Sequence, residues 1–87
     1  MTKNTMNQSD DRYEVTIAAP GRRLVPLAVK TAVWGKVKRP VNGLWRSDLK
    51  GAVTYQTHYR HSAVQVCEAA GELGYRAELR DLSPNKN

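Results

Sequence analysis

An amphipathic stretch in the last third of this 87-residue chain constrains its fold more strongly than any other feature. Small apolar side chains recur there at helical spacing, which predicts a helix over residues 63–73. Ser62 and Gln65 have the spacing of a capping box at its start, and Gly74 stands where a helix ends in a residue of positive φ. Gly71 predicts close approach of the helix to a sheet. The apolar stripe consists of Ala63, Val66, Cys67, Ala70 and Leu73.

Three further segments have the pattern of half-buried strands. Residues 75–80, directly after the helix, alternate between apolar or aromatic and charged side chains. Residues 13–18 alternate in a similar way, and they are followed by Pro20-Gly21, a dipeptide typical of a tight turn. Residues 52–59 give another strand, which a turn over residues 48–51 introduces. One helix among several strands is typical of the α+β class.

The segment over residues 24–34 fits two secondary structures. Its apolar and β-branched side chains at every second position favour a strand, because they suit a pleated surface. A helix is the alternative, with Pro26 at its first position and Gly35 beyond its end. We favour the strand. The helix would change the element order to β-α-β-β-α-β and the fold to ferredoxin-like.

Two tryptophans, Trp34 and Trp45, bracket the stretch in which aromatic bulk and dense positive charge coincide. Asn42-Gly43 within this stretch is the dipeptide of a type I′ turn, so we predict a β-hairpin across it. Pro40 lacks a backbone N–H, which places its strand at a sheet edge. We predict that Trp34 is buried in the core and that Trp45 lies on the surface.

These segments together predict a single α+β domain over residues 12–82. It has a small antiparallel sheet of about four or five strands, with one helix from the C-terminal half packed on one face, in the order β-β-β-β-α-β. The ferredoxin-like βαββαβ fold is the alternative. Residues 1–11 are polar and predict a disordered leader, and residues 83–87 predict a flexible tail.

Positive charge is concentrated in the middle of the chain. The net charge is +6, and the stretch from Arg12 to Arg60 has ten lysines and arginines against two acidic residues, Glu14 and Asp48. This asymmetry favours a polyanion or an acidic protein surface as partner. A core of roughly 70 residues rarely supplies more than ~3–5 kcal/mol, so a partner or a second copy in a homodimer would add stability.

Several chemistries find no support in the sequence. Cys67 is the single cysteine, which excludes an internal disulfide and a cysteine metal cage and fits a reducing compartment. The six glycines are scattered, so no glycine-rich loop is present to hold a phosphate. No apolar run approaches the ~20 residues of a membrane span. We therefore expect a cytoplasmic protein with no cofactor, no metal and no membrane partner.

The run from His58 to His61 has the most reactive side chains of the chain. The two histidines flank Arg60, a set that could perform acid–base chemistry on a phosphodiester, as in a small ribonuclease. The spacing matches no specific motif, and such histidines are more often solvated or packing residues. A metal site from His58, His61 and Cys67 has less support, because zinc sites need three or four ligands at recognisable spacing. We expect binding and no catalytic residues.

We predict a non-enzymatic binding module whose basic hairpin face contacts nucleic-acid phosphates. Its lysines and arginines would neutralise phosphates, and its exposed tryptophan would stack on bases or pack against sugars. The structural alternative is that these cations only solubilise exposed strand faces. The predicted binding residues are Arg22, Arg23, Lys36, Lys38, Arg39, Trp45, Arg46 and Lys50.

The alternative function is that of a protein-binding inhibitor or adaptor. A small basic domain with Trp45 as anchor and arginines at the rim can dock on an acidic protein or nucleoprotein surface. Small size without a catalytic motif is typical of inhibitors that phages and mobile elements direct against host defence or nucleic-acid-handling complexes. Salt separates the two functions, because phosphate-led binding weakens steeply as the salt concentration rises.

Overall fold

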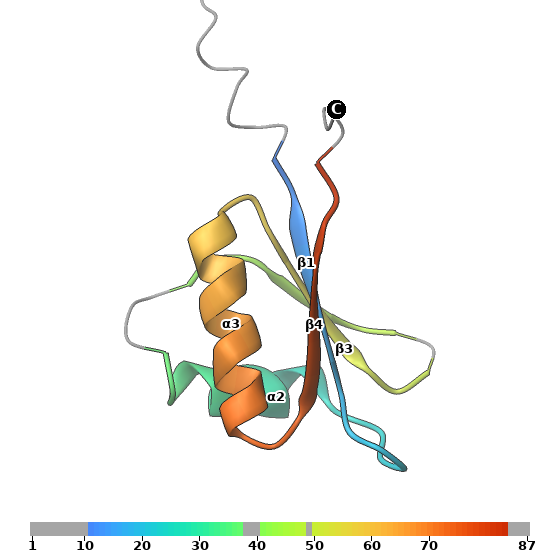
Figure 1. The fold of residues 1–87 in the computed structure, drawn as a ribbon. Helices are drawn as coiled ribbons and strands as arrows, with labels where there is room; N and C mark the ends of the chain where they lie inside the picture. Colours follow the sequence, from blue (N-terminus) through green and yellow to red (C-terminus); the bar gives the residue numbers. More distant parts are fainter. Residues whose placement is uncertain (1–10, 38–40, 49, 84–87) are drawn as a thin grey trace, which may run out of the picture.

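The computed structural model describes residues 11–37, 41–48 and 50–83, which form a four-stranded antiparallel sheet and two helices (Figure 1). The sheet order is β2-β3-β1-β4, and every neighbouring pair is antiparallel. The predicted α+β class is confirmed. The elements are β1 (Tyr13–Ala18), α2 (Pro26–Trp34), β2 (Leu44–Ser47), β3 (Val53–Thr57), α3 (Arg60–Glu72) and β4 (Arg76–Asp81).

The strand predicted for residues 24–34 is wrong, because this segment forms helix α2. Pro26 lies in its first turn, where a missing backbone N–H costs nothing. Val29 and Val33, one helical turn apart, are buried in the core. Their burial on one side of a helix overrides the strand preference of β-branched residues. The element order is therefore β-α-β-β-α-β, which is the order of the alternative prediction. The favoured order β-β-β-β-α-β is wrong.

Both helices pack on one face of the sheet. Helix α3 lies against β4, β1 and β3, whereas α2 lies against β2 and β3 and touches α3 (Figure 1). The sheet contributes alternate residues to this core, as the pleat requires. The opposite face, which we call the open face, carries the remaining alternate residues. The largest fully buried side chains are Val15, Ile17, Val29, Val33, Val53, Tyr55 and Val66.

Helix α3 confirms one predicted end and corrects the other. Its C-terminus is as predicted: Gly74 has φ +93°, its N–H donates to the Gly71 carbonyl, and the Tyr75 N–H donates to the Ala70 carbonyl. The capping box is wrong, because the helix begins at Arg60 and Ser62 is buried inside its first turn. The close approach predicted for Gly71 is also wrong, since a Cβ there would meet no other atom within 4 Å.

The β-hairpin predicted across Asn42-Gly43 is wrong. Gly43 has no positive φ, and a Cβ on it would overlap the Gln56 carbonyl oxygen and the Tyr55 ring. The Tyr55 hydroxyl donates to the Asn42 carbonyl at 2.7 Å, so this segment is held against β3. The strand predicted before this turn covers residues 36–41: Lys36, Val37 and Val41 belong to no strand, and residues 38–40 lie outside the described residues.

The hairpin that is observed joins β2 to β3 through the turn predicted over residues 48–51. Gly51 has φ +90°, and the Asp48 carboxylate accepts the backbone N–H groups of Lys50 at 2.7 Å and Ala52 at 3.1 Å. The turn predicted at Pro20-Gly21 is confirmed as well, with φ +69° at Gly21. Two tight turns therefore lie at the same end of the sheet, where β1 and β2 end and β3 begins.

Candidate nucleic-acid interface

A group of five cations gathers at this end of the sheet, and we call it the basic end. The loop after β1 and the β2–β3 turn are held together by a hydrogen bond of 2.8 Å from the Leu24 N–H to the Gly51 carbonyl. A Cβ on Gly51 would lie 3.3 Å from the Cα of Arg23, so the two loops are in contact. They carry three of the cations, and adjoining strand ends carry the other two. The basic end consists of Arg22, Arg23, Lys50, Arg46 and Arg76.

The charges of the basic end are uncompensated. All five side chains are exposed, and none of them forms an ion pair within the described part of the chain. Asp48 is the acid nearest in sequence to Lys50, and its carboxylate already accepts two backbone N–H groups of the turn. A cluster of exposed cations on fixed loops attracts anions to one place on the surface.

The structure brings together four of the eight predicted binding residues, namely Arg22, Arg23, Arg46 and Lys50. Lys36 follows the far end of α2, after about 14 Å of helix, and is not part of this group. Lys38 and Arg39 lie outside the described residues. Arg76 was missed, because only the pairing of β4 with β1, which sets it opposite Ala18, places it at this end.

The two tryptophans have the reverse of their predicted positions. Trp34 is 52% exposed on the outer side of α2, where the Lys30 ammonium lies 5.0 Å from its ring centroid. Trp45 is half-buried on the core face of β2, and its ring centroid lies 4.8 Å from that of its cross-strand neighbour Tyr55. Trp45 therefore offers only part of its surface for the predicted stacking on bases.

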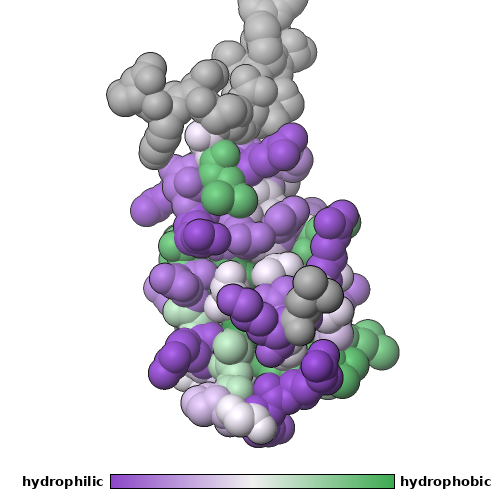
Figure 2. Space-filling model, turned by 90° about the vertical axis from the view of Figure 1, so that its right-hand side faces the viewer, coloured by the Kyte–Doolittle hydropathy of each residue, from purple (hydrophilic) through white to green (hydrophobic). Residues whose placement is uncertain are grey.

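The open face of the sheet is polar. The central strands β1 and β3 place Glu14, Thr16, Thr54 and Gln56 on it, and no aromatic ring lies among these positions. Figure 2 shows the side of the molecule that lies to the right in Figure 1, away from helix α3, and most of this surface is hydrophilic. Some four-stranded sheets bind RNA through the face that their helices leave uncovered, and they stack bases on aromatic side chains of their central strands. The described residues of the open face provide no aromatic ring for such stacking.

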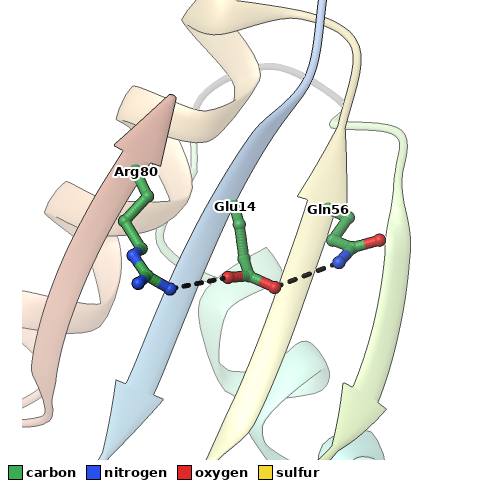
Figure 3. Close-up of polar contacts among 3 residues, drawn as sticks. All are labelled: Glu14, Gln56 and Arg80. Carbon is green, nitrogen blue, oxygen red and sulfur yellow. Dashed lines mark hydrogen bonds and ion pairs between the residues drawn. The ribbon is translucent and has the colours of Figure 1, made fainter. Parts of the chain in front are cut away.

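A row of three polar side chains crosses the open face (Figure 3). Glu14 on β1 accepts a hydrogen bond of 3.0 Å from the Gln56 amide on β3, and the Arg80 guanidinium on β4 lies 3.7 Å from its other oxygen. The three residues are cross-strand neighbours in the register. Glu14 is thus paired with Arg80, and this row of the open face carries little net negative charge.

A hollow of about 520 Å³ lies at the end of the sheet opposite to the basic end. It is formed where β1 and β2 begin and where β3 and β4 end. Residues from four separate segments build it, so no single stretch of sequence could have indicated it. Its lining consists of Arg12, Tyr13, Asn42, Gly43, Leu44, Gln56, Thr57, His58, Tyr59 and Leu82.

The reactive side chains noted in the sequence do not converge. His58 lines the hollow and its Nδ1 lies 2.7 Å from the Asp11 carbonyl oxygen, whereas Arg60 and His61 begin α3 and are not part of the lining. Burial raises the pKa of the Cys67 thiol, and the adjacent Glu68 carboxylate raises it further, which disfavours the nucleophilic thiolate. In the part of the chain that is described, no three His, Cys, Asp or Glu side chains are grouped to hold a metal ion.

Neither helix of the described chain is long and apolar enough to cross a membrane. Comparisons of the chain with protein-family models, curated proteins and solved structures found no match.

Proposed function

We propose that this protein is a non-enzymatic domain that binds nucleic acid by holding phosphates at its basic end. The observation that supports this proposal is the meeting of Arg22, Arg23 and Lys50 on two hydrogen-bonded loops, beside Arg46 and Arg76, with no acidic partner for any of them among the described residues. Phosphates spaced along a backbone are the ligands that such a cluster of cations recognises without regard to sequence.

Binding of this kind depends strongly on salt. Each phosphate that the protein neutralises releases counterions, so log K falls linearly with log[salt], by about 0.9 per contact on duplex DNA. The polar open face offers no stacking surface for bases in its described strands, so phosphate contacts dominate the affinity. We expect little sequence preference.

The experiment compares the intact protein with the triple variant Arg22→Ala/Arg23→Ala/Lys50→Ala. The probe is a fluorescein-labelled DNA duplex of mixed sequence, titrated by anisotropy from about 50 mM salt upwards. The intact protein should bind with a steep salt slope. The triple variant should bind far more weakly, and its slope should be smaller by about 2 to 3, because each lost phosphate contact removes about 0.9.

A charge-matched control separates a localised site from general attraction. The variant Lys30→Ala/Lys36→Ala/Arg60→Ala also removes three positive charges from the net +6, but from the helix side of the molecule. It should retain most of the affinity. Equal losses in both variants would show that net charge alone drives binding. Failure of the intact protein to bind duplex, single strand and RNA at about 50 mM salt would refute the proposal.

A second candidate function, docking on an acidic protein surface as an inhibitor or adaptor, is favoured by the outer side of α2. Leu27 is 70% exposed and lies two turns from the exposed Trp34, so the two share one helical stripe with Lys30. No acidic residue occurs between residues 15 and 47. An apolar groove with an acidic rim would complement this side. The anchor would then be Trp34, and no longer Trp45.

Nuclease treatment distinguishes this second function from the first. In a pulldown from nuclease-treated lysate, a protein partner should remain bound to the intact domain and be lost with Trp34→Ala. The Arg22→Ala/Arg23→Ala/Lys50→Ala variant should still retain it. If every captured protein disappears on nuclease treatment, the interaction is carried by nucleic acid and the second function is wrong.

A further inference from the structure

We propose that the hollow at the end opposite to the basic end receives a base of single-stranded nucleic acid, so that the protein prefers single strands to duplexes. This inference rests on the proposed function and extends it to a second contact point. The basic end would hold the backbone, and the hollow would hold an unstacked nucleotide. The lining supports this division of roles, as do the distance between the two sites and the polarity of the face between them.

The hollow collects exposed apolar surface. Six large apolar or aromatic side chains of the described residues are exposed, and three of them line it: Leu44 at 50%, Tyr59 at 53% and Leu82 at 43%. Exposed apolar side chains that gather around one concavity mark a binding site more often than scattered ones do. The volume of about 520 Å³ lies within the roughly 300–1,000 Å³ of small-ligand sites.

The chemistry of the lining fits a nucleotide. Tyr59 provides an exposed aromatic ring beside the apolar side chains, and Tyr13 provides a partly buried one; a nucleobase stacks on such rings whatever its identity. Arg12 contributes a positive charge at the same hollow, which suits the phosphate attached to that base. The Gln56 amide is already engaged with Glu14, so it offers little for reading base edges. Stacking on the aromatic rings is therefore the contact that the lining supports most directly.

One strand of nucleic acid could reach both sites across the open face. Strand β1 has six residues, which span about 20 Å between the hollow and the basic end. The row of Glu14, Gln56 and Arg80 borders the hollow, and Arg80 compensates the charge of Glu14 there (Figure 3). In the next row toward the basic end, Glu78 on β4 is the one acidic side chain, and Arg46 on β2 lies in the same row without forming an ion pair with it. No large repulsive barrier separates the two sites.

A duplex cannot use the hollow in the same way. Its bases are stacked and paired, and a base must be flipped out before it can enter a concave pocket, which costs unpairing and unstacking energy. A single strand has unstacked bases available at no such cost. The hollow therefore predicts a preference for single strands that the basic end alone would not give.

The test uses three probes and two substitutions in the hollow. The probes are a duplex, a single strand of about 12 thymidine nucleotides, and a strand of equal length in which abasic sites replace the bases. Tyr59→Ala should weaken thymidine-strand binding about tenfold and leave duplex binding within twofold, with the salt slope unchanged. Tyr59→Phe keeps the ring and should bind like the intact protein. Leu82→Gln, a neutral substitution at the exposed rim, should reproduce the effect of Tyr59→Ala without changing a residue of α3 or the net charge.

The outcomes separate this inference from the proposed function. If the intact protein binds the thymidine strand and the abasic strand equally, or if neither Tyr59→Ala nor Leu82→Gln affects the thymidine strand selectively, the hollow holds no base. Duplex binding that still depends on the basic end would then leave the proposed function standing. If the intact protein binds none of the three probes, both proposals are wrong. Circular dichroism of each variant establishes that the fold is retained.

Discussion

The unit formed by α3 and β4 and the unit formed by α2 and β2 obtain their structure in different ways. In the first, the decisive contacts are close in sequence: Gly74 and Tyr75 donate to carbonyls at the end of the same helix. In the second, they come from distant residues: Asn42 accepts from Tyr55, and Trp45 packs on the same ring. Local chemistry therefore shapes one unit, whereas tertiary contacts with β3 shape the other.

This difference has an energetic counterpart. A unit defined by local bonds tolerates substitutions away from its backbone turns, because each contact is small and nearby. A unit defined by packing against Tyr55 depends on a few residues whose loss opens space or forces atoms together. Substitutions near Tyr55 should thus cost more than substitutions in α3 that meet no neighbour.

The largest effect should come from Trp45→Ala. Removing this half-buried ring takes away its packing on Tyr55 and the core, and we expect a loss of about 3 kcal/mol in the free energy of unfolding. Trp34→Ala is the matched control, because that ring is 52% exposed and its contact with Lys30 is worth about 0.5–1 kcal/mol. Urea unfolding measures both. A larger loss for Trp34→Ala would contradict the assignment of the two rings.

The second effect concerns close approach at Gly43. A Cβ there would overlap the Gln56 carbonyl oxygen and the Tyr55 ring, so Gly43→Ala should cost about 2 kcal/mol through overpacking. Gly35→Ala is the control, since its nearest contact is an ordinary 3.5 Å and it should change stability little. If both substitutions are neutral in thermal or urea unfolding, the segment before β2 is not held against β3.

The sequence predicted those parts of the fold whose cause is local. Alternation indicated β1 and β4, the turns that contain Gly21 and Gly51 were predicted at the right places, and Gly74 was identified as a residue of positive φ. Residues 24–34 were assigned to the wrong class, because Val29 and Val33 share a face in a strand as well as in a helix. Only burial under the sheet decides between the two.

The candidate site was predictable in composition but not in arrangement. Arg22, Arg23 and Lys50 stood out as basic residues, but nothing in the sequence shows that a hydrogen bond from Leu24 to Gly51 brings their loops together. The hollow depends on the sheet order, which joins segments up to about 70 residues apart, so it leaves no local pattern. Periodicity in the sequence indicates single strands, but it does not predict which distant strands pair.

The third effect concerns the buried phenol of Tyr55 and depends on pH. Burial raises the pKa of Tyr55 above its ordinary value of 10.0. Because the folded pKa lies above the unfolded one, the contribution of this group to stability is complete below about pH 10 and is lost as the pH rises beyond it. Tyr55→Phe should cost about 1 kcal/mol at neutral pH through its lost hydrogen bond to Asn42, and this difference should shrink above pH 10.

Urea unfolding of both proteins between about pH 8 and pH 11 measures this difference directly. All other side chains are identical in the two proteins, so their effects cancel when the two stability curves are subtracted. A difference that stays constant across this range would show that the phenol is not buried away from water.

The smallest effect should be a gain of stability in α3. Gly71 lies near the end of the helix, and a Cβ there would meet no other atom within 4 Å, so Gly71→Ala should stabilise the protein by about 0.5–1 kcal/mol through helix propensity. Gly74→Ala, three residues on, is the opposing control, because φ +93° is unfavourable for any residue with a Cβ and should cost stability. Thermal unfolding of the pair tests whether local chemistry governs this unit. A destabilising Gly71→Ala would show that this position of α3 does not tolerate a Cβ. The contrast between the α3–β4 unit and the unit around Tyr55 would then be wrong at this position.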